Sequence, residues 1–113
     1  MWRDEALLLD MLIAARRAKE FSAGLDRQAF ESSLLHQQGI MRCLETVGEA
    51  ARRVSEDTRR RYPQVPWSEI IGMRHRLVHE YFRIDLDRVW DTVQKDLQPL
   101  IALLEPLVPP EKA

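Results

Sequence analysis

The amino-acid sequence predicts an all-α protein, a bundle of four to five helices in a single domain. Apolar residues recur at steps of three and four along most of the chain, and no alternating strand pattern competes with them. The composition agrees, because glycine is scarce and four of the six prolines lie after residue 98. The length of 113 residues suits one domain with a small core, which burial of further surface in a dimer would stabilise.

The first helix is expected over residues 4–21, with Asp4 as a candidate N-cap and Gly24 in the left-handed position that follows. Its apolar stripe comprises Leu8, Met11, Leu12, Ala15, Ala18 and Phe21. Asp26 is expected to cap a second segment that bends at Ser32 and Ser33.

A long helix is then expected to continue as far as about Arg60. Its apolar stripe comprises Leu34, Ile40, Met41, Leu44, Val47, Ala51 and Val54. Gly39 and Gly48 lie inside this helix and cost about 1 kcal/mol each relative to Ala. We therefore expect another helix to cross at these two positions.

Pro63 and Pro66 break the helical pattern, and the next helix is expected over residues 67–80, with Ser68 as an alternative cap. Asp85 is expected to cap the last helix, which Pro99 should kink. The apolar residues of that helix are Leu86, Val89, Trp90, Val93, Leu97, Leu100, Ile101 and Leu104. The domain is expected to span residues 1–105, with a flexible tail over residues 106–113.

The formal charge of −1 argues against a uniformly basic nucleic-acid-binding protein but allows a local basic face. Of the 17 basic residues 14 are Arg, a bias that suits phosphate contacts and equally suits a GC-rich genome. Cys43 is the only cysteine, which excludes an internal disulfide and a cysteine-rich metal site. The start of the chain lacks a signal-peptide pattern, and residues 7–15 are too short to span a membrane, so a cytoplasmic protein is expected.

An arginine, two histidines and a tyrosine lie within eight residues at the end of a predicted helix. Arg74 suits the binding of a scissile phosphate, because its planar fork of donors matches phosphate oxygens. His79 suits proton transfer to or from a ribose or a leaving group, since its charge changes near neutral pH. His75 could support this chemistry, and the Tyr81 hydroxyl could bind the phosphate or accept a modification.

The spacing of these residues constrains how they can act together. On an ideal helix, Arg74 and His79 differ by about 140° and do not share a face, whereas His75 and His79 do. A working site therefore needs a helix that ends near His79 or a second chain that completes the cleft. The second option predicts a symmetric homodimer with a shared site.

Other interpretations of the same residues stay open. His75 and His79 could bind zinc with Glu80 or Asp85, although the neighbouring arginines disfavour a cation and the metalloprotease pattern is absent. A histidine at a helix end and an ion-paired arginine are also common without any catalytic role. Four arginines are candidates for RNA binding or for an ordinary solvated surface: Arg52, Arg53, Arg76 and Arg83.

Four segments of the chain resemble the HepT-like toxins of the HEPN superfamily (higher eukaryotes and prokaryotes nucleotide-binding). The first is the segment from Leu44 to Ala51, which contains Gly48 and Glu49, and the second is the loop from Tyr62 to Trp67. The third runs from Gly72 to Phe82 and carries the pattern Arg74-x4-His79-x-Tyr81. The fourth is the segment from Ile84 to Trp90.

This resemblance implies a dimeric HEPN-type helical bundle and a metal-independent endoribonuclease toxin without a cofactor. It implies a type VII-like toxin–antitoxin system, whose antitoxin is a small MNT-type nucleotidyltransferase. Arg74 and His79 would form the catalytic pair at a dimer cleft, and AMP attached to Tyr81 would silence the enzyme. The chain departs from the family in having His75 where Asn is common and Arg83 where Gly is common. A non-catalytic nucleotide-binding or protein-interaction module is the alternative function.

Overall fold

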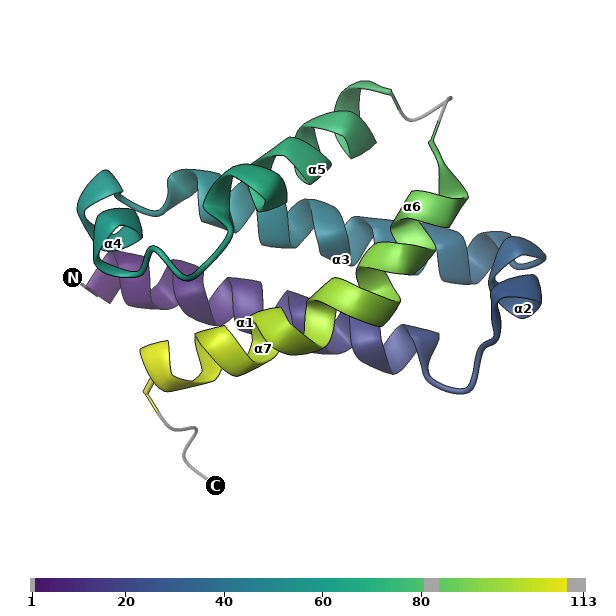
Figure 1. Ribbon diagram of the computed structural model, residues 1–113, viewed down its shortest axis with the longest axis horizontal. Helices are drawn as coiled ribbons and strands as arrows, with labels where there is room; N and C mark the ends of the chain where they lie inside the picture. The colour runs from purple at the N-terminus through teal and green to yellow at the C-terminus, as the bar shows by residue number, and fades with distance from the viewer. Residues whose placement is uncertain (1, 81–83, 110–113) are drawn as a thin grey trace.

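Two long antiparallel helices, α1 (Trp2–Ser22) and α3 (Leu34–Arg53), lie side by side and form the base of the fold (Figure 1). The computed structural model describes residues 2–80 and 84–109. Gly24 follows α1 with a φ of 79°, as expected for a left-handed residue after a helix. Asp26 caps the short helix α2 (Arg27–Glu31) by accepting a hydrogen bond from the Ala29 amide, which confirms its predicted role.

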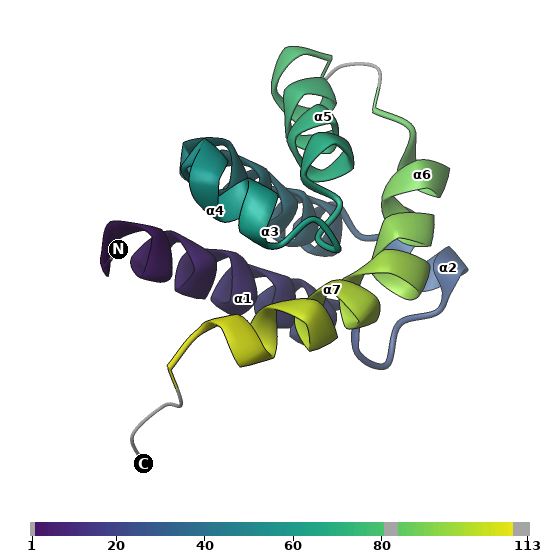
Figure 2. The ribbon, with the colours of Figure 1, turned by 60° about the vertical axis from the view of Figure 1, so that its left-hand side comes forward.

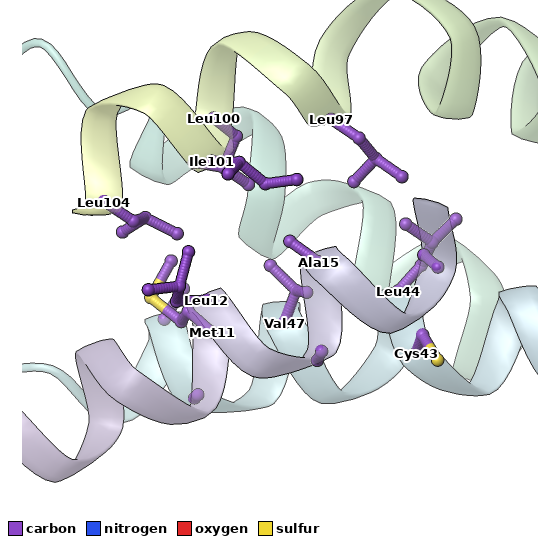
Figure 3. Close-up of a cluster of buried hydrophobic side chains, with 14 of the residues drawn as sticks. Met11, Leu12, Ala15, Cys43, Leu44, Val47, Leu97, Leu100, Ile101 and Leu104 are labelled. Carbon is purple, nitrogen blue, oxygen red and sulfur yellow. The ribbon is translucent and has the colours of Figure 1, made fainter. Parts of the chain in front are cut away.

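The hydrophobic core lies where α1, α3 and α7 (Leu97–Leu104) meet (Figure 3). The core side chains labelled there are Met11, Leu12, Ala15, Cys43, Leu44, Val47, Leu97, Leu100, Ile101 and Leu104. These residues come largely from the predicted apolar stripes, so the periodicity identified the faces that are removed from water. Phe30 adds α2 to the core, because it is fully buried and its ring centroid lies 5.2 Å from that of Trp90.

The long middle helix ends at Arg53, so the expectation that it continues to about Arg60 is wrong. Val54 adopts an extended backbone with a ψ of 139°, and Ser55 caps a separate helix, α4 (Glu56–Arg61). The Ser55 hydroxyl accepts a hydrogen bond from the Thr58 amide, which is the usual contact of an N-cap serine. The break thus has a local cause, a serine cap that competes with helix continuation.

Asp4 lies inside the first turn of α1 and does not cap it, so this predicted role is also wrong. The buried Asp4 carboxylate accepts hydrogen bonds from the Ser55 amide, the Ser55 hydroxyl and the Thr58 hydroxyl, at 3.2, 2.6 and 2.6 Å. The contact joins α1 to the start of α4 across more than fifty residues of chain. The hydrogen bond from Ser55, followed by that from Thr58, lowers the pKa of Asp4.

Helix α5 (Trp67–His79) crosses α3 and stands apart from α6 and α7 (Figure 2). The two prolines end the preceding segment, as predicted, and Pro66 occupies the N-cap position of α5. Ser68 lies within the first turn and is not the cap. The Trp67 side chain anchors this end, because its indole N–H donates to the Tyr62 carbonyl at 3.0 Å.

The last helical run is divided into α6 (Leu86–Asp91), the π-helical segment η2 (Thr92–Asp96) and α7. Asp85 caps α6 as predicted, accepting from the Asp87 and Arg88 amides. Pro99 cannot donate to the carbonyl of Lys95 four residues earlier, and its ring crowds that carbonyl. The irregularity therefore lies just before Pro99. A short 3-10 turn, η3 (Glu105–Leu107), follows α7, and Leu107 and Val108 pack against the core.

Within the described ranges the chain is all α, with four long helical runs and the two short helices α2 and α4, and no strand. The predicted all-α class is confirmed, the two short helices bring the number of helices above the four to five that were expected, and the dimer stays a prediction. In the described part of the chain no helix is long and apolar enough to cross a bilayer.

Candidate functional site

Helix α5 carries most of the candidate catalytic residues in its last turns. The helix ends at His79, and the Glu80 amide donates to the Arg76 carbonyl at 2.9 Å. The spacing of the motif requires either a helix that ends near His79 or a second chain that completes the cleft, and the end of α5 meets the first of these conditions. Tyr81 and Arg83 lie outside the described residues, so the expectations about them are neither supported nor opposed by the structure.

Arg74 lies against α3 and is half-buried. Its Nη2 atom forms an ion pair with Glu49 Oε2 at 3.0 Å, and the two side chains are 25% and 35% exposed. A Cβ atom built on Gly48 would lie 2.1 Å from the Cβ of Arg74 and 3.1 Å from the Ile70 carbonyl oxygen. Gly48 therefore allows α5 to approach α3 closely at Arg74, as the mid-helix glycine predicted. A Cβ built on Gly39 would lie 3.3 Å from the Phe21 ring, a tighter than usual contact but a far milder one than the clash at Gly48.

Glu49 is held by a second arginine as well. Arg52 Nη2 donates to Glu49 Oε1 at 2.6 Å, and Arg52 Nε donates to Glu49 Oε2 at 3.4 Å. The hydrogen bond from Arg52 lowers the pKa of Glu49, and the positive charges of Arg52, Arg74 and Arg53 act in the same direction. The Glu49 carboxylate is thus charged at neutral pH and connects two guanidinium groups.

The two histidines of the motif lie side by side on an exposed face of α5. The ring centroids of His75 and His79 are 4.4 Å apart and the ring planes are tilted by 44°. Their contact confirms that positions 75 and 79 share a face, as their i,i+4 spacing predicted. Arg74 instead faces α3, so a single chain presents the arginine and the histidines on different sides of the helix.

A surface hollow of about 660 Å³ lies between α1, α3 and α5 and contains Arg74, and we call it the Arg74 hollow. Its lining includes three basic residues, Arg42, Arg53 and Arg74, and three acidic residues, Asp10, Glu45 and Glu49. Neither histidine of the motif is among the described residues that line it. Of the candidate RNA-binding arginines that the structure describes, Arg52, Arg53 and Arg76, only Arg53 shares the hollow with Arg74.

Arg76 lies on another side of α5, in a hollow of about 510 Å³ formed with the α6–η2–α7 run. Its Nε atom is buried and has no hydrogen-bond partner among the described residues. Arg52 is exposed but committed to Glu49. The candidate RNA-binding arginines are therefore not gathered on one surface of the described chain.

The zinc interpretation depends on a third ligand beside the two histidines. Within residues 2–80 and 84–109, no group of three or more His, Cys, Asp or Glu side chains could hold a metal ion. The described residues thus do not complete the zinc site considered from the sequence.

Sequence reasoning missed the contact between Glu49 and Arg74. Along α3 itself, Arg42 pairs with Glu45 at 3.5 Å, a contact that i,i+3 spacing alone allows. Glu49 instead pairs with Arg52 and across to α5. The signal that points to this contact is the neighbouring Gly48, since a glycine inside a helix marks the place where a second helix, and with it a cross-helix partner, can approach.

The fold and the site define a small all-helical protein that places a carboxylate-bound arginine and a pair of exposed histidines in the last turns of one helix. The chain belongs to the HepT-like family, because a model of that family described as "Ribonuclease HepT-like" matches residues 11–107.

Similar proteins carry the same kind of name. The chain is 37% identical over 93 residues to "Putative RNase MJ1380" of Methanocaldococcus jannaschii, covering 82% of this chain and 85% of that protein. It is 33% identical over 100 residues to "Probable ribonuclease HepT" of Thermococcus cleftensis, covering 88% and 91% of the two chains. No solved structure matches the chain significantly.

Proposed function

We propose that this chain is a metal-independent endoribonuclease in which Arg74 and His79 are the catalytic pair. The observation that carries the proposal is the end of α5, where the half-buried Arg74 and the exposed His79 lie five residues apart in a chain of the HepT-like ribonuclease family. A fixed guanidinium can stabilise charge on the phosphate, and a solvent-accessible imidazole can transfer a proton, which are two functions that cleavage of RNA without a metal uses.

In the proposed reaction the ribose 2′-oxygen attacks the adjacent phosphorus and the bond to the 5′-oxygen breaks. The products are a 2′,3′-cyclic phosphate and a 5′-hydroxyl. His79 takes the proton from the 2′-hydroxyl or gives one to the departing 5′-oxygen, and Arg74 stabilises the charge that develops on the phosphate. His75, whose ring lies against His79, supports the orientation of that ring.

The proposed working unit is a homodimer with a shared cleft. Support comes from the arrangement within one chain, where Arg74 faces α3 while His79 faces solvent. A second chain related by twofold symmetry can bring a histidine of one protomer to the arginine of the other. Arg52, Arg53, Arg76 and Arg83 are proposed to contact the RNA backbone outside the scissile phosphate.

The biological role proposed is that of the toxin in a type VII-like HEPN/MNT toxin–antitoxin system. An MNT-type nucleotidyltransferase antitoxin would transfer AMP to the Tyr81 hydroxyl. The adduct adds bulk and a negative charge two residues from His79, so it would repel an RNA phosphate and block the site. This part of the proposal rests on the Arg74-x4-His79-x-Tyr81 pattern and on membership of the family.

The test is cleavage of single-stranded RNA in the presence of a chelator by protein purified without a partner. Wild type should cleave and leave cyclic phosphate ends, whereas His79→Ala and Arg74→Ala should lose at least about a hundredfold in rate. Arg60→Ala is the matched control, because Arg60 is an exposed, ion-paired arginine on α4. The mass of the protein should be measured first, since an adduct on Tyr81 would itself abolish cleavage.

Cleavage that persists in both His79→Ala and Arg74→Ala would reject the catalytic assignment. An unmodified wild type that binds nucleotide or a partner protein without cleaving RNA would support the alternative function, a non-catalytic binding module.

A further inference from the structure

We infer that Glu49 is a positioning residue for Arg74, holding its guanidinium in the orientation that receives the RNA phosphate. The inference rests on the proposed function, because it deepens the role given there to Arg74. It goes beyond the predicted pattern, because none of the three fixed residues of that pattern is acidic and all of them come from the stretch 74–81.

The first support is that Arg74 is held at both ends of its side chain. Its Cβ lies over Gly48, where no other residue type would leave room, and its Nη2 atom binds Glu49 Oε2 at 3.0 Å. Gly48 and Glu49 are consecutive residues of α3. One short segment of α3 thus fixes both the origin and the tip of a side chain that is long and flexible in water.

The second support is that Glu49 is itself immobilised. Arg52 engages both of its carboxylate oxygens, at 2.6 and 3.4 Å, from the next turn of the same helix. The hydrogen bond from Arg52 also lowers the pKa of Glu49, so the Glu49 carboxylate is charged in the folded protein at neutral pH. A fixed, charged acceptor orients a guanidinium better than a mobile one can.

The third support is that, among the residues the structure describes, Glu49 contacts one end of the Arg74 guanidinium and leaves the rest of it available to a ligand. The carboxylate contacts Nη2 and does not form a two-pronged pair with the guanidinium, since Glu49 Oε1 is bound to Arg52. Arg74 therefore keeps donors on Nη1 and Nε for phosphate oxygens. This geometry favours an orienting role over a blocking role, in which the carboxylate would occupy the whole fork and compete with RNA.

The experiment measures the affinity for a single-stranded RNA that carries 2′-O-methyl groups and cannot be cleaved, at several salt concentrations. Four proteins form the cycle: wild type, Glu49→Ala, Arg74→Ala and the double variant. Glu49→Ala should weaken binding about tenfold in the wild-type background, the loss expected for one misplaced charge-assisted contact. In the Arg74→Ala background it should weaken binding no further, because the residue it positions is gone.

Two further measurements separate positioning from a general structural effect. A plot of log affinity against log salt concentration has a negative slope. In Glu49→Ala and in Arg74→Ala alike, this slope should become shallower by about 0.7, the value for one lost phosphate contact on a single strand. Glu49→Gln should recover part of the loss, since it keeps the shape of Glu49 and its amide oxygen can lie as close to Nη2 as Glu49 Oε2 does. Glu56→Ala is the control, because it removes an exposed, ion-paired carboxylate on α4 and should leave the slope unchanged.

Three results would overturn the inference. Glu49→Ala could weaken RNA binding equally in the wild-type and Arg74→Ala backgrounds, or it could tighten RNA binding in the wild-type background alone. The third is that Glu49→Gln binds RNA no more tightly than Glu49→Ala. Thermal unfolding of each variant identifies any that does not fold, and Glu49→Gln, the nearest in shape, then carries the test. Failure of the proposed ribonuclease would appear separately. If the proposed function is wrong, Arg74→Ala would bind the uncleavable RNA as tightly as wild type does. Alternatively, the cleavage assay would show no difference between wild type and any of the variants.

Discussion

The Cβ of Arg74 lies directly over Gly48, so that a Cβ built on the glycine would be 2.1 Å from it. Carbon atoms that are not bonded to each other do not approach as closely as this. The crossing of α5 over α3 therefore depends on the absence of a side chain at position 48. The same crossing sets the place of Arg74 beside Glu49, so helix packing and the geometry of the candidate site are linked.

Gly48→Ala should lower the free energy of unfolding by about 2 kcal/mol, because the added methyl group forces α5 away from α3. The loss should appear as a decrease of about 8 °C in Tm, measured by circular dichroism at one fixed protein concentration. RNA cleavage should fall as well, since Arg74 moves with α5.

Gly72→Ala is the matched control for that experiment. Gly72 also lies inside a helix, but the atom nearest to an added Cβ is Arg76 Nη1 at 3.9 Å, which is ordinary contact with a flexible side chain. Replacement there should raise stability by up to about 1 kcal/mol through helix propensity alone. Equal effects at the two positions would show that the crossing does not depend on Gly48.

Asp4 should make stability depend on pH in the acidic range. The folded pKa of Asp4 lies below its unfolded value of about 3.9, so its contribution is fully present above about pH 5 and is lost as pH falls through the folded pKa. At pH 7, Asp4→Asn should cost about 2 kcal/mol, because three donors lose a charged acceptor. Urea unfolding between pH 7 and pH 3 should show the gap between wild type and variant narrowing below pH 4.

Asp57→Asn serves as the control for Asp4, since the Asp57 side chain is 89% exposed on α4. This variant should differ little from wild type at any pH in the range. A gap between wild type and Asp4→Asn that stays constant down to pH 3 would contradict the assigned role.

Cys43 should be unreactive in the folded protein. Its side chain is buried in α3, and burial raises the pKa of the thiol, so the reactive thiolate is scarce at neutral pH. Reaction with a chromogenic disulfide at pH 7.5 should be at least about a hundredfold slower in buffer than in guanidinium chloride. Rapid labelling of the native protein would show that the α1–α3 interface opens readily.

Phe30 should hold the short helix α2 in place. It is fully buried against the ring of Trp90, so Phe30→Ala should lower the free energy of unfolding by about 3–5 kcal/mol. Phe21→Ala is the comparison, since Phe21 is 43% exposed and should cost less than about 1 kcal/mol. The two variants can be compared by urea unfolding, and equal losses would mean that α2 does not depend on Phe30.

The candidate site was partly predictable. Arg74, His75 and His79 lie close together in the sequence, so their place on one helix could be predicted. The contact of His75 with His79 follows from their i,i+4 spacing alone. The ion pair between Arg74 and Glu49 joins residues 25 positions apart, and no local pattern encodes which carboxylate an arginine meets across two helices. The same holds for Asp4, which looked like a cap on its own helix but accepts its hydrogen bonds from Ser55 and Thr58.

The all-α class, the buried faces and most helix ends follow from residues close together in the chain, because apolar spacing, caps such as Asp26 and Asp85, and prolines act over a few residues. The crossing of α5 over α3, the place of Glu49 beside Arg74, and the contact of Asp4 with Ser55 and Thr58 become visible only in the folded chain. These features depend on close approach between distant segments, where the absence of one methyl group or the position of one carboxylate selects the arrangement.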